Sequence, residues 1–290
     1  MKIYHQPILA TTIIEAFRLS ESSIVADLTT GEGGHSELIA PLIQNGKLFC
    51  MDRDNEILSI ARSRLNKFTH VEYVCDTYNN LTTRRLEVGF PLFDGILVDM
   101  GISMFHFKGV QRGFSFEDDN LDMRLNPELT LTAEKIINTF SEKDLSDIFY
   151  YYGEEFSSRR FAQAVVRQRP FFSAKDLAQC IRHAANRKTK THPATKIFQA
   201  LRIYVNDELE IAENFLKEAV NNLAPGGTLA ILTFHSLEDR IVKNAFKEFA
   251  AKKLGNMLNK KPIIPDFGEI RNNPAARSAK LRIFKRNLCI

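Results

Sequence analysis

The sequence predicts an α/β fold in which helices cross over a parallel sheet, interrupted by a separate helical domain. In the first hundred residues, short apolar runs of β type alternate with stretches whose apolar residues recur at helical spacing, a pattern typical of crossover connections. The strand pattern stops between residues 107 and 195 and then returns. The 290 residues, 44% hydrophobic and 26% charged, suffice for one large core or two unequal ones. We expect a discontinuous sheet domain, 1–106 with 196–290, and an inserted helical domain, 107–195.

Four strands and two helices are expected before the insertion. The strands are 23–28, 47–52, 70–76 and 93–100, and the helices between them are 34–43 and 55–68. The insertion begins with an acidic loop-like segment and continues with helices near 132–139, 142–152, 157–167 and 174–186.

After the insertion the chain should return to the sheet. Pro193 suits the first turn of a helix, and apolar residues lie on one stripe from Ile197 to Leu216, which predicts one long helix. Proline and two glycines end it within 222–227. A fifth strand at 228–234, a helix at 237–254 and a late strand at 280–284 follow.

Composition excludes several classes of protein. No run approaches the ~18 apolar residues of a membrane helix, and the first twelve residues lack the features of a secretory signal. The four cysteines are scattered, which fits neither a zinc site nor a disulfide framework; they are Cys50, Cys75, Cys180 and Cys289. We expect a soluble, cytoplasmic protein with buried thiols, no metal and no membrane partner.

Charge is distributed unevenly along the chain. Residues 117–155 hold eleven acidic side chains against three basic ones, whereas 156–202 hold eleven basic side chains against Asp176 alone. From Arg240 to the end, thirteen basic residues face three acidic ones. Cationic blocks favour a polyanionic partner, because neutralised phosphates release counterions. Solvated helical faces are the alternative.

A glycine-rich turn and a later carboxylate together predict a nucleotide site. The first strand ends in DLTTGEGGHS, residues 27–36, and the second ends in Asp52, twenty-one residues beyond Gly31. Glycines let the backbone approach a ligand, and a carboxylate at this spacing can accept both hydroxyls of an adenosine ribose. The combination is more specific than either half.

Two features favour S-adenosylmethionine (SAM) over a dinucleotide. His35 stands where a dinucleotide loop has its third glycine, and Asp27 would repel a diphosphate but suits an ammonium and a sulfonium. The third strand is followed by Asp76 and Tyr78, and the fourth ends near Asp99 and Gly101. These groups share the carboxyl edge of the sheet, where open α/β sheets bind ligands.

These residues resemble the RsmH/MraW family, bacterial methyltransferases that modify the exocyclic N4 of a decoding-region cytidine in 16S rRNA. The similarity covers nearly the whole chain, and the matching segments include HQPIL (5–9), the glycine turn, DGILVDMGIS (94–103), RGFSFEDDNLDMR (112–124), YGEEFSSRR (152–160), HPATKIFQALRIYVNDEL (192–209), PGGTLAILTFHSLEDRIVK (225–243) and NPAARSAKLR (273–282).

The resemblance implies a class I SAM-dependent methyltransferase sheet with an inserted domain that contacts RNA. The family's cofactor contacts fall on Gly33, Gly34, His35, Asp52, Tyr78 and Asp99. Tyr78 replaces the family's usual phenylalanine. His106 stands where the family usually has glutamine, and it can still form one hydrogen bond.

The group that accepts the hydrogens of the target amine is not set by a motif. Many amino-methylating enzymes use Asn or Asp before two prolines, and this chain has no Pro-Pro. Asp99 could serve both cofactor and substrate; the other candidates are Asp122, His192, His235 and Glu238. Each of these could instead cap a helix or pair with Arg124 or Arg240.

RNA binding would combine cations with aromatic rings on which bases stack. Candidate rings beside arginines are Phe114, Phe116, Phe156, Phe161, Phe171 and Phe172. Because the chain has 22 Phe and no Trp, most of these rings should lie in the core.

Competing hypotheses for the function are an NAD-dependent oxidoreductase, a non-catalytic RNA-binding or assembly factor, and a methyltransferase for protein or small molecules. For the oligomeric state, the sequence is compatible with a monomer and with a homodimer.

Overall fold

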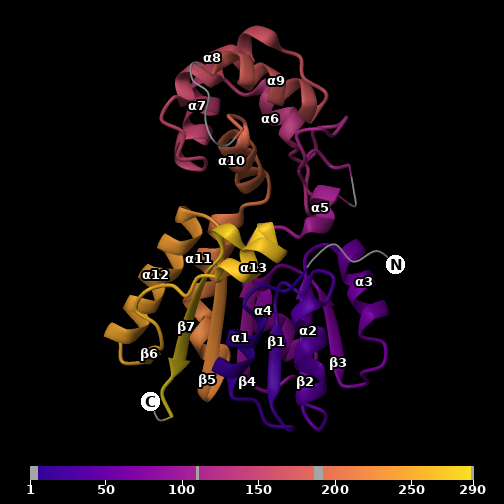
Figure 1. The fold of residues 1–290 in the computed structure, drawn as a ribbon, viewed down its shortest axis with the longest axis vertical. Helices are drawn as coiled ribbons and strands as arrows, with labels where there is room; N and C mark the ends of the chain where they lie inside the picture. Colours follow the sequence, from indigo (N-terminus) through magenta and orange to yellow (C-terminus); the bar gives the residue numbers. More distant parts are fainter. Residues whose placement is uncertain (1–5, 109–110, 186–191, 289–290) are drawn as a thin grey trace. The chain divides into compact units, whose positions relative to one another are not determined.

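A seven-stranded mixed sheet organises the larger part of the chain in the computed structural model, which describes residues 6–108, 111–185 and 192–288. The strand order is β3-β2-β1-β4-β5-β7-β6 (Figure 1). The bounds are β1 Ile24–Asp27, β2 Lys47–Asp52, β3 Val71–Cys75, β4 Phe93–Asp99, β5 Leu223–Thr233, β6 Gly255–Met257 and β7 Lys280–Arg286. Strands β1 to β5 are parallel, and β7 runs antiparallel to both β5 and β6. The predicted α/β class is confirmed.

The order of the strands creates a switch point at the centre of the sheet. The chain moves outward from β1 to β2 and β3, and then returns to place β4 on the other side of β1. Ligands of open α/β sheets bind outside the carboxyl ends of the strands at such a point. Asp27, Asp52 and Asp99 are the last residues of β1, β2 and β4, so three carboxylates lie at this edge.

Both faces of the central strands β1, β2, β4 and β5 are buried, and successive side chains of each strand point to opposite faces. Ala26, Phe49 and Ile96 belong to one apolar cluster, while Val25 and Leu97 belong to the other. The helices of this part are α1 Ala10–Phe17, α2 Gly34–Ile39, α3 Asn55–Arg64, α4 Leu81–Glu87, α11 Glu208–Glu218, α12 Ser236–Ala251 and α13 Phe267–Asn272. Four short 3-10 segments complete it, at 40–42, 78–80, 219–222 and 274–278.

The chain divides into two compact units, 1–103 with 209–290 and 104–208. The second unit is helical, and its bounds are wider than those of the predicted helical insertion, 107–195. Its helices are α5 Met104–Lys108, α6 Ala133–Thr139, α7 Glu142–Tyr151, α8 Ser158–Gln168, α9 Ala174–Ala184 and α10 Thr195–Val205. Thr132, Ser141 and Ser173 cap α6, α7 and α9 by accepting a backbone N–H, which satisfies a donor that a helix start leaves unpaired.

The prediction of one long helix from Pro193 was wrong. The structure has two helices, because Val205 ends α10 and Asp207 takes a φ of 49° before α11 begins. Strand β5 also begins earlier than predicted, at Leu223. Short elements without a long apolar pattern were missed: α1, α4, α13 and β6.

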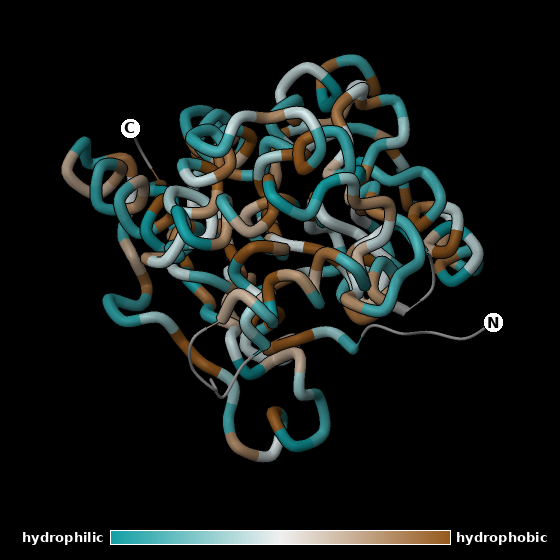
Figure 2. The backbone as a smooth tube through the Cα atoms, turned by 90° about the horizontal axis from the view of Figure 1, so that it is seen from above, coloured by the Kyte–Doolittle hydropathy of each residue, from teal (hydrophilic) through white to brown (hydrophobic). Residues whose placement is uncertain are grey.

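No helix among the described residues is long and apolar enough to cross a membrane. Along the chain in Figure 2, hydrophobic and hydrophilic stretches alternate at short intervals. Cys50 and Cys180 are buried as expected, but Cys75 is exposed; Cys289 lies outside the described residues. Burial raises the pKa of the Cys180 thiol to about 11.

Candidate active site

The glycine turn after β1 is held close to the neighbouring helix. Gly33 has a φ of 81°, a conformation that side chains rarely adopt, and a Cβ there would lie 3.4 Å from the Cβ of Ala61. A Cβ on Gly34 would lie 3.3 Å from Cδ of Pro7. Both glycines therefore keep the backbone of the turn packed between α3 and the segment that precedes α1.

Asp52 fixes the start of this turn. Its Oδ2 accepts the N–H of Gly31 at 2.8 Å, and its Oδ1 accepts the N–H of Asp54 at 3.0 Å. Asp54 in turn caps α3 through the N–H of Glu56. The carboxylate that the spacing singled out is thus held at the end of β2 by two backbone donors, beside the turn.

Asp27 is an acid buried without full compensation. The side chain is 1% exposed. Its Oδ2 accepts the hydroxyl of Ser36 at 2.6 Å, whereas its Oδ1 is buried and has no hydrogen-bond partner among the described residues. Burial raises the pKa of Asp27, and the nearby Asp99 raises it further, while His35 and hydrogen bonds from Ser36 and the Thr29 backbone act in the opposite direction.

Asp99 lies at the end of the adjacent strand. Its backbone N–H donates to Oγ1 of Thr29 at 2.6 Å, which joins β4 to the turn after β1. Because Asp99 contributes to raising the pKa of Asp27, two acidic side chains lie close together at the switch point. Such a pair favours a cationic ligand, whose charge would relieve both the repulsion and the burial.

Tyr78 and Asp76 follow β3. The Tyr78 ring contacts Phe215 of α11 edge to face, with ring centroids 5.3 Å apart. Arg84 pairs with Asp76 at 2.6 Å. Partial burial raises the pKa of Asp76, but hydrogen bonds from Arg84, Asn80 and Thr77 outweigh it and the pKa is lowered.

The two predicted histidine contacts have side chains engaged within the protein. His35 is buried, and its Nε2 lies 3.0 Å from the carbonyl oxygen of Ile8, so a cofactor contact by His35 would use its backbone. His106 belongs to the helical unit, where its buried ring lies 5.8 Å from Phe105 and 5.6 Å from Phe114.

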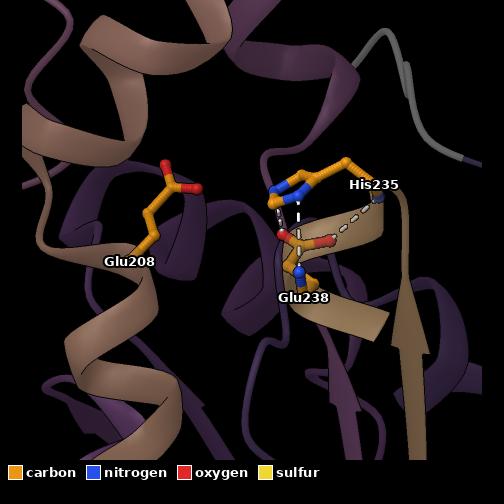
Figure 3. Close-up of side chains that lie close together, drawn as sticks. All are labelled: Glu208, His235 and Glu238. Atoms are coloured by element: carbon orange, nitrogen blue, oxygen red, sulfur yellow. Dashed lines mark hydrogen bonds and ion pairs between the residues drawn. The ribbon is translucent and has the colours of Figure 1, made fainter. Parts of the chain in front are cut away.

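His235 and Glu238 form a capping box at the start of α12 (Figure 3). Nδ1 of His235 accepts the N–H of Glu238 at 3.4 Å, and Glu238 Oε2 accepts the N–H of Phe234 at 2.7 Å. Nε2 of His235 lies 3.0 Å from Oε1 of Glu238. Glu208, also labelled in Figure 3, belongs to the helical unit, where Arg202 pairs with it at 2.8 Å.

Asp122 and His192 also have structural partners. Both carboxylate oxygens of Asp122 accept hydrogen bonds from Arg124, at 2.7 and 2.8 Å. His192 stacks against Phe116 with ring centroids 4.7 Å apart, and its Nδ1 accepts the N–H of Ala194. Burial, together with Arg182, lowers the pKa of His192 against the opposing effect of Glu117. The pairing with Arg124 that was weighed for Asp122 is therefore observed, whereas the contact of His192 with Phe116 was not among the alternatives weighed.

Three of the six candidate stacking rings are buried, namely Phe114, Phe161 and Phe171. Phe116 is half-buried against His192 and Phe198, whereas Phe156 and Phe172 are 84% and 63% exposed. Among the described residues of the predicted basic block, 156–202, five cationic side chains are exposed: Arg159, Arg167, Lys175, Arg182 and Lys196. Three more cations of the predicted basic block, Arg187, Lys188 and Lys190, lie outside the described residues.

The comparison with known protein families shows to which family the chain belongs. Residues 2–287 match the model of the MraW methylase family. The chain belongs to this family. A ribosomal RNA small subunit methyltransferase H from Dictyoglomus turgidum is 43% identical, covering 99% of this chain and 98% of the relative. Proteins of the same name from Cyanothece sp. and Thermosipho africanus are 42% and 43% identical, each covering 97% of this chain and 94% and 97% of the relative.

Within this MraW-family chain, sequence reasoning missed the groups that orient the predicted carboxylates. Ser36 binds Asp27, and Thr29 binds the backbone of Asp99. Both are hydroxyl residues inside the glycine-turn segment, residues 27–36. The sequence analysis included them in the turn but did not predict that their hydroxyls form hydrogen bonds.

Proposed function

We propose that this chain transfers the methyl group of SAM to the exocyclic N4 of a cytidine in the decoding region of 16S rRNA. The family and its relatives make the chain a methyltransferase of small-subunit ribosomal RNA. The cytidine, its N4 and the decoding region come from the family resemblance. The proposal for the site rests on the arrangement of Asp27 and Asp99.

The observation that carries the choice of SAM is the pair of carboxylates at the switch point. Asp27 keeps one oxygen buried without a hydrogen-bond donor among the described residues, and Asp99 lies near enough to raise its pKa. A dinucleotide would bring two negative phosphates to this point, whereas SAM brings an ammonium and a sulfonium. We expect the methionine part of SAM to bind here.

The remaining cofactor contacts follow from their places along the edge of the sheet. The backbone at Gly33, Gly34 and His35 would contact the methionine part, Asp52 the ribose hydroxyls, and Tyr78 the adenine ring. The role of His106 as a further contact stays a prediction.

SAM supplies a methyl group on a positively charged sulfur, so the leaving thioether is neutral and needs no acid. The protein must hold the amine in line with the methyl carbon, which can contribute about 7 to 11 kcal/mol. The cytosine amine is a weak nucleophile, because its lone pair is delocalised into the ring. A carboxylate that accepts hydrogen bonds from the amine would weaken this delocalisation, and it would take up the proton that the nitrogen loses once the methyl group is attached.

We assign this role to Asp99, because it is the candidate that ends a strand at the cofactor edge. Asp122 and His235 stay weaker candidates, since Arg124 holds both oxygens of Asp122 and His235 caps α12.

The decisive experiment is mass mapping of methylated nucleosides in small-subunit rRNA from cells that lack this protein. We expect one N4-methylated cytidine to disappear and to return on complementation with the wild-type chain. Return of the mark with Asp52→Ala, or an unchanged set of marks in the deletion strain, would contradict the proposal.

Calorimetry separates the competing hypotheses. SAM should bind and NAD should not. Asp52→Ala should lower the affinity for SAM about 10- to 100-fold, because the charge-assisted hydrogen bonds to the ribose are lost. Affinity for rRNA should stay close to the wild-type value. A non-catalytic RNA-binding factor would bind rRNA equally well but give no methyl incorporation with any substrate.

A further inference from the structure

A cavity lies in the sheet unit, at the carboxyl end of β5. Its volume is about 320 Å³, and it is lined by residues 234–236, which follow β5, and by residues 277–280, which lead into β7. This volume is at the lower end of the range for sites that bind small molecules. None of the cofactor contacts proposed above line it.

One wall of the cavity is apolar and exposed at its rim. Ile264, Pro265 and Ile270 form this wall. Ile264 is 66% exposed, and Phe267 nearby on α13 is 81% exposed. Apolar side chains left in solvent beside a cavity are typical of a binding surface.

Two cations also line the cavity. These are Arg277 and Lys280, and no carboxylate is among its described lining residues. Asp239, 3.9 Å from Nζ of Lys280, already accepts two hydrogen bonds from Arg282 at 2.7 and 3.1 Å. Lys280 therefore adds a charge that Asp239 does not neutralise, and Arg277 is exposed. Ser278, between these cations, adds a hydroxyl to the lining.

Two contacts connect the cavity to the edge of the sheet where the cofactor is proposed to bind. Phe234 lines the cavity, and the same ring lies 3.6 Å from where a Cβ on Gly101 would be, two residues beyond Asp99. On the other side, Glu269 of α13 accepts the N–H of Leu9 at 2.7 Å. The residue before Leu9, Ile8, binds His35 of the glycine turn.

The geometry points to this cavity as the site for one nucleotide of the RNA strand that flanks the reacting cytidine. Its phosphate would bind Arg277 and Lys280, and its ribose and base would pack on Ile264 and Pro265. Cations beside apolar or aromatic side chains are the usual combination for unpaired nucleotides. This inference rests on the proposed function and adds a strand-positioning site to it.

The test uses Arg277→Gln, Lys280→Gln and the double variant, with Lys247→Gln as the matched control. Lys247 is exposed on α12, three turns from the cavity. Methylation is measured on small ribosomal subunits from cells that lack the protein. Each cavity variant should raise KM about tenfold, with kcat and SAM affinity unchanged; the control should match the wild type.

Salt dependence gives a second readout that a merely structural role would not change. For binding of a 16S rRNA fragment, the slope of log affinity against log salt should fall by about 0.7 for each cation removed. Variants with wild-type KM and slope would overturn this inference while leaving the proposed function intact. Absence of methylation by the wild-type chain would instead overturn the proposed function.

Discussion

Asp27 is a single residue whose burial lowers the stability of the folded chain. Burial disfavours the charged form of an acid, and Asp99 adds repulsion. An ionised carboxylate in this position lowers the stability of the chain without its cofactor. A cationic ligand removes that cost on binding, so the same two charges contribute to affinity.

Asp27→Asn should therefore stabilise the protein in the absence of SAM and weaken SAM binding. The raised pKa means that the protonated acid is favoured in the folded state, so the wild type loses stability as pH rises above about 3.9, the unfolded value. Asparagine resembles the protonated form at every pH. The free energy of unfolding in urea should be similar for both chains at low pH, and Asn should become more stable as pH rises.

Each unit by which the pKa is raised adds about 1.4 kcal/mol to this difference. A difference that did not grow with pH would show that Asp27 is not a strained acid.

Asp76→Asn is the matched control with the opposite sign. The pKa of Asp76 is lowered, chiefly by Arg84 and despite partial burial. Its contribution to stability is therefore present above the unfolded pKa and is lost as pH falls through the folded one. Asp76→Asn should destabilise the chain at neutral pH and match the wild type in acid, which urea unfolding at two pH values can measure.

The sequence distance from the glycine turn was sufficient to predict Asp52 as a site residue, but it did not predict the hydrogen bonds that orient its carboxylate. A carboxylate twenty-one residues after Gly31 at a strand end is a pattern in the sequence. The bond from Gly31 N–H to Asp52 depends on where the turn folds back. The same holds for His235, whose capping role requires the exact start of α12.

At the scale of elements, α10 and α11 show why a continuous apolar stripe need not be one helix. Asn206 is 1% exposed, and its Oδ1 accepts the N–H of Leu125 at 2.8 Å. Its Nδ2 donates to the carbonyl oxygen of Met123 at 2.7 Å. The side chain thus joins the end of α10 to the acidic loop, and these partners lie too far along the chain for periodicity to reveal them.

Asn206→Ala should destabilise the protein by about 1 to 3 kcal/mol, because a buried donor and acceptor of the loop lose their partner. Gln163→Ala, at an exposed position on α8, is the control and should change stability by less than about 0.5 kcal/mol. Denaturant unfolding gives both values. Equal stability of the two variants would mean that water replaces Asn206.

The central strands were the most predictable elements, because both of their faces are buried and each contains a run of apolar residues. β2 was predicted with its observed bounds, Lys47–Asp52. The three-residue strand β6 has one buried position, and pairing with β7 defines it. Sequence alone therefore indicates the centre of the sheet better than its far edge.

At the scale of the whole molecule, the proposed cofactor residues and the exposed cations of the predicted basic block lie largely in different compact units. Asp27, Asp52, Tyr78 and Asp99 belong to 1–103, whereas the exposed cations Arg159 and Lys175 belong to 104–208. Binding of SAM and binding of rRNA should therefore respond differently to salt. A cofactor with a net charge of about +1 displaces few counterions, but an RNA strand with many phosphates displaces many.

Replacing four exposed cations of the helical unit with glutamine should weaken rRNA binding and leave SAM binding unchanged; the four are Arg159, Arg167, Lys175 and Arg182. If each contacts one phosphate of unpaired RNA, the slope of log affinity against log salt falls by about 0.7 per residue. Lys143→Gln is the control, because Lys143 is 84% exposed but already paired with Asp147. Filter binding from low to physiological salt measures the slopes, and calorimetry measures SAM. An unchanged slope in the fourfold variant would show that these cations are solvated and that RNA binds elsewhere.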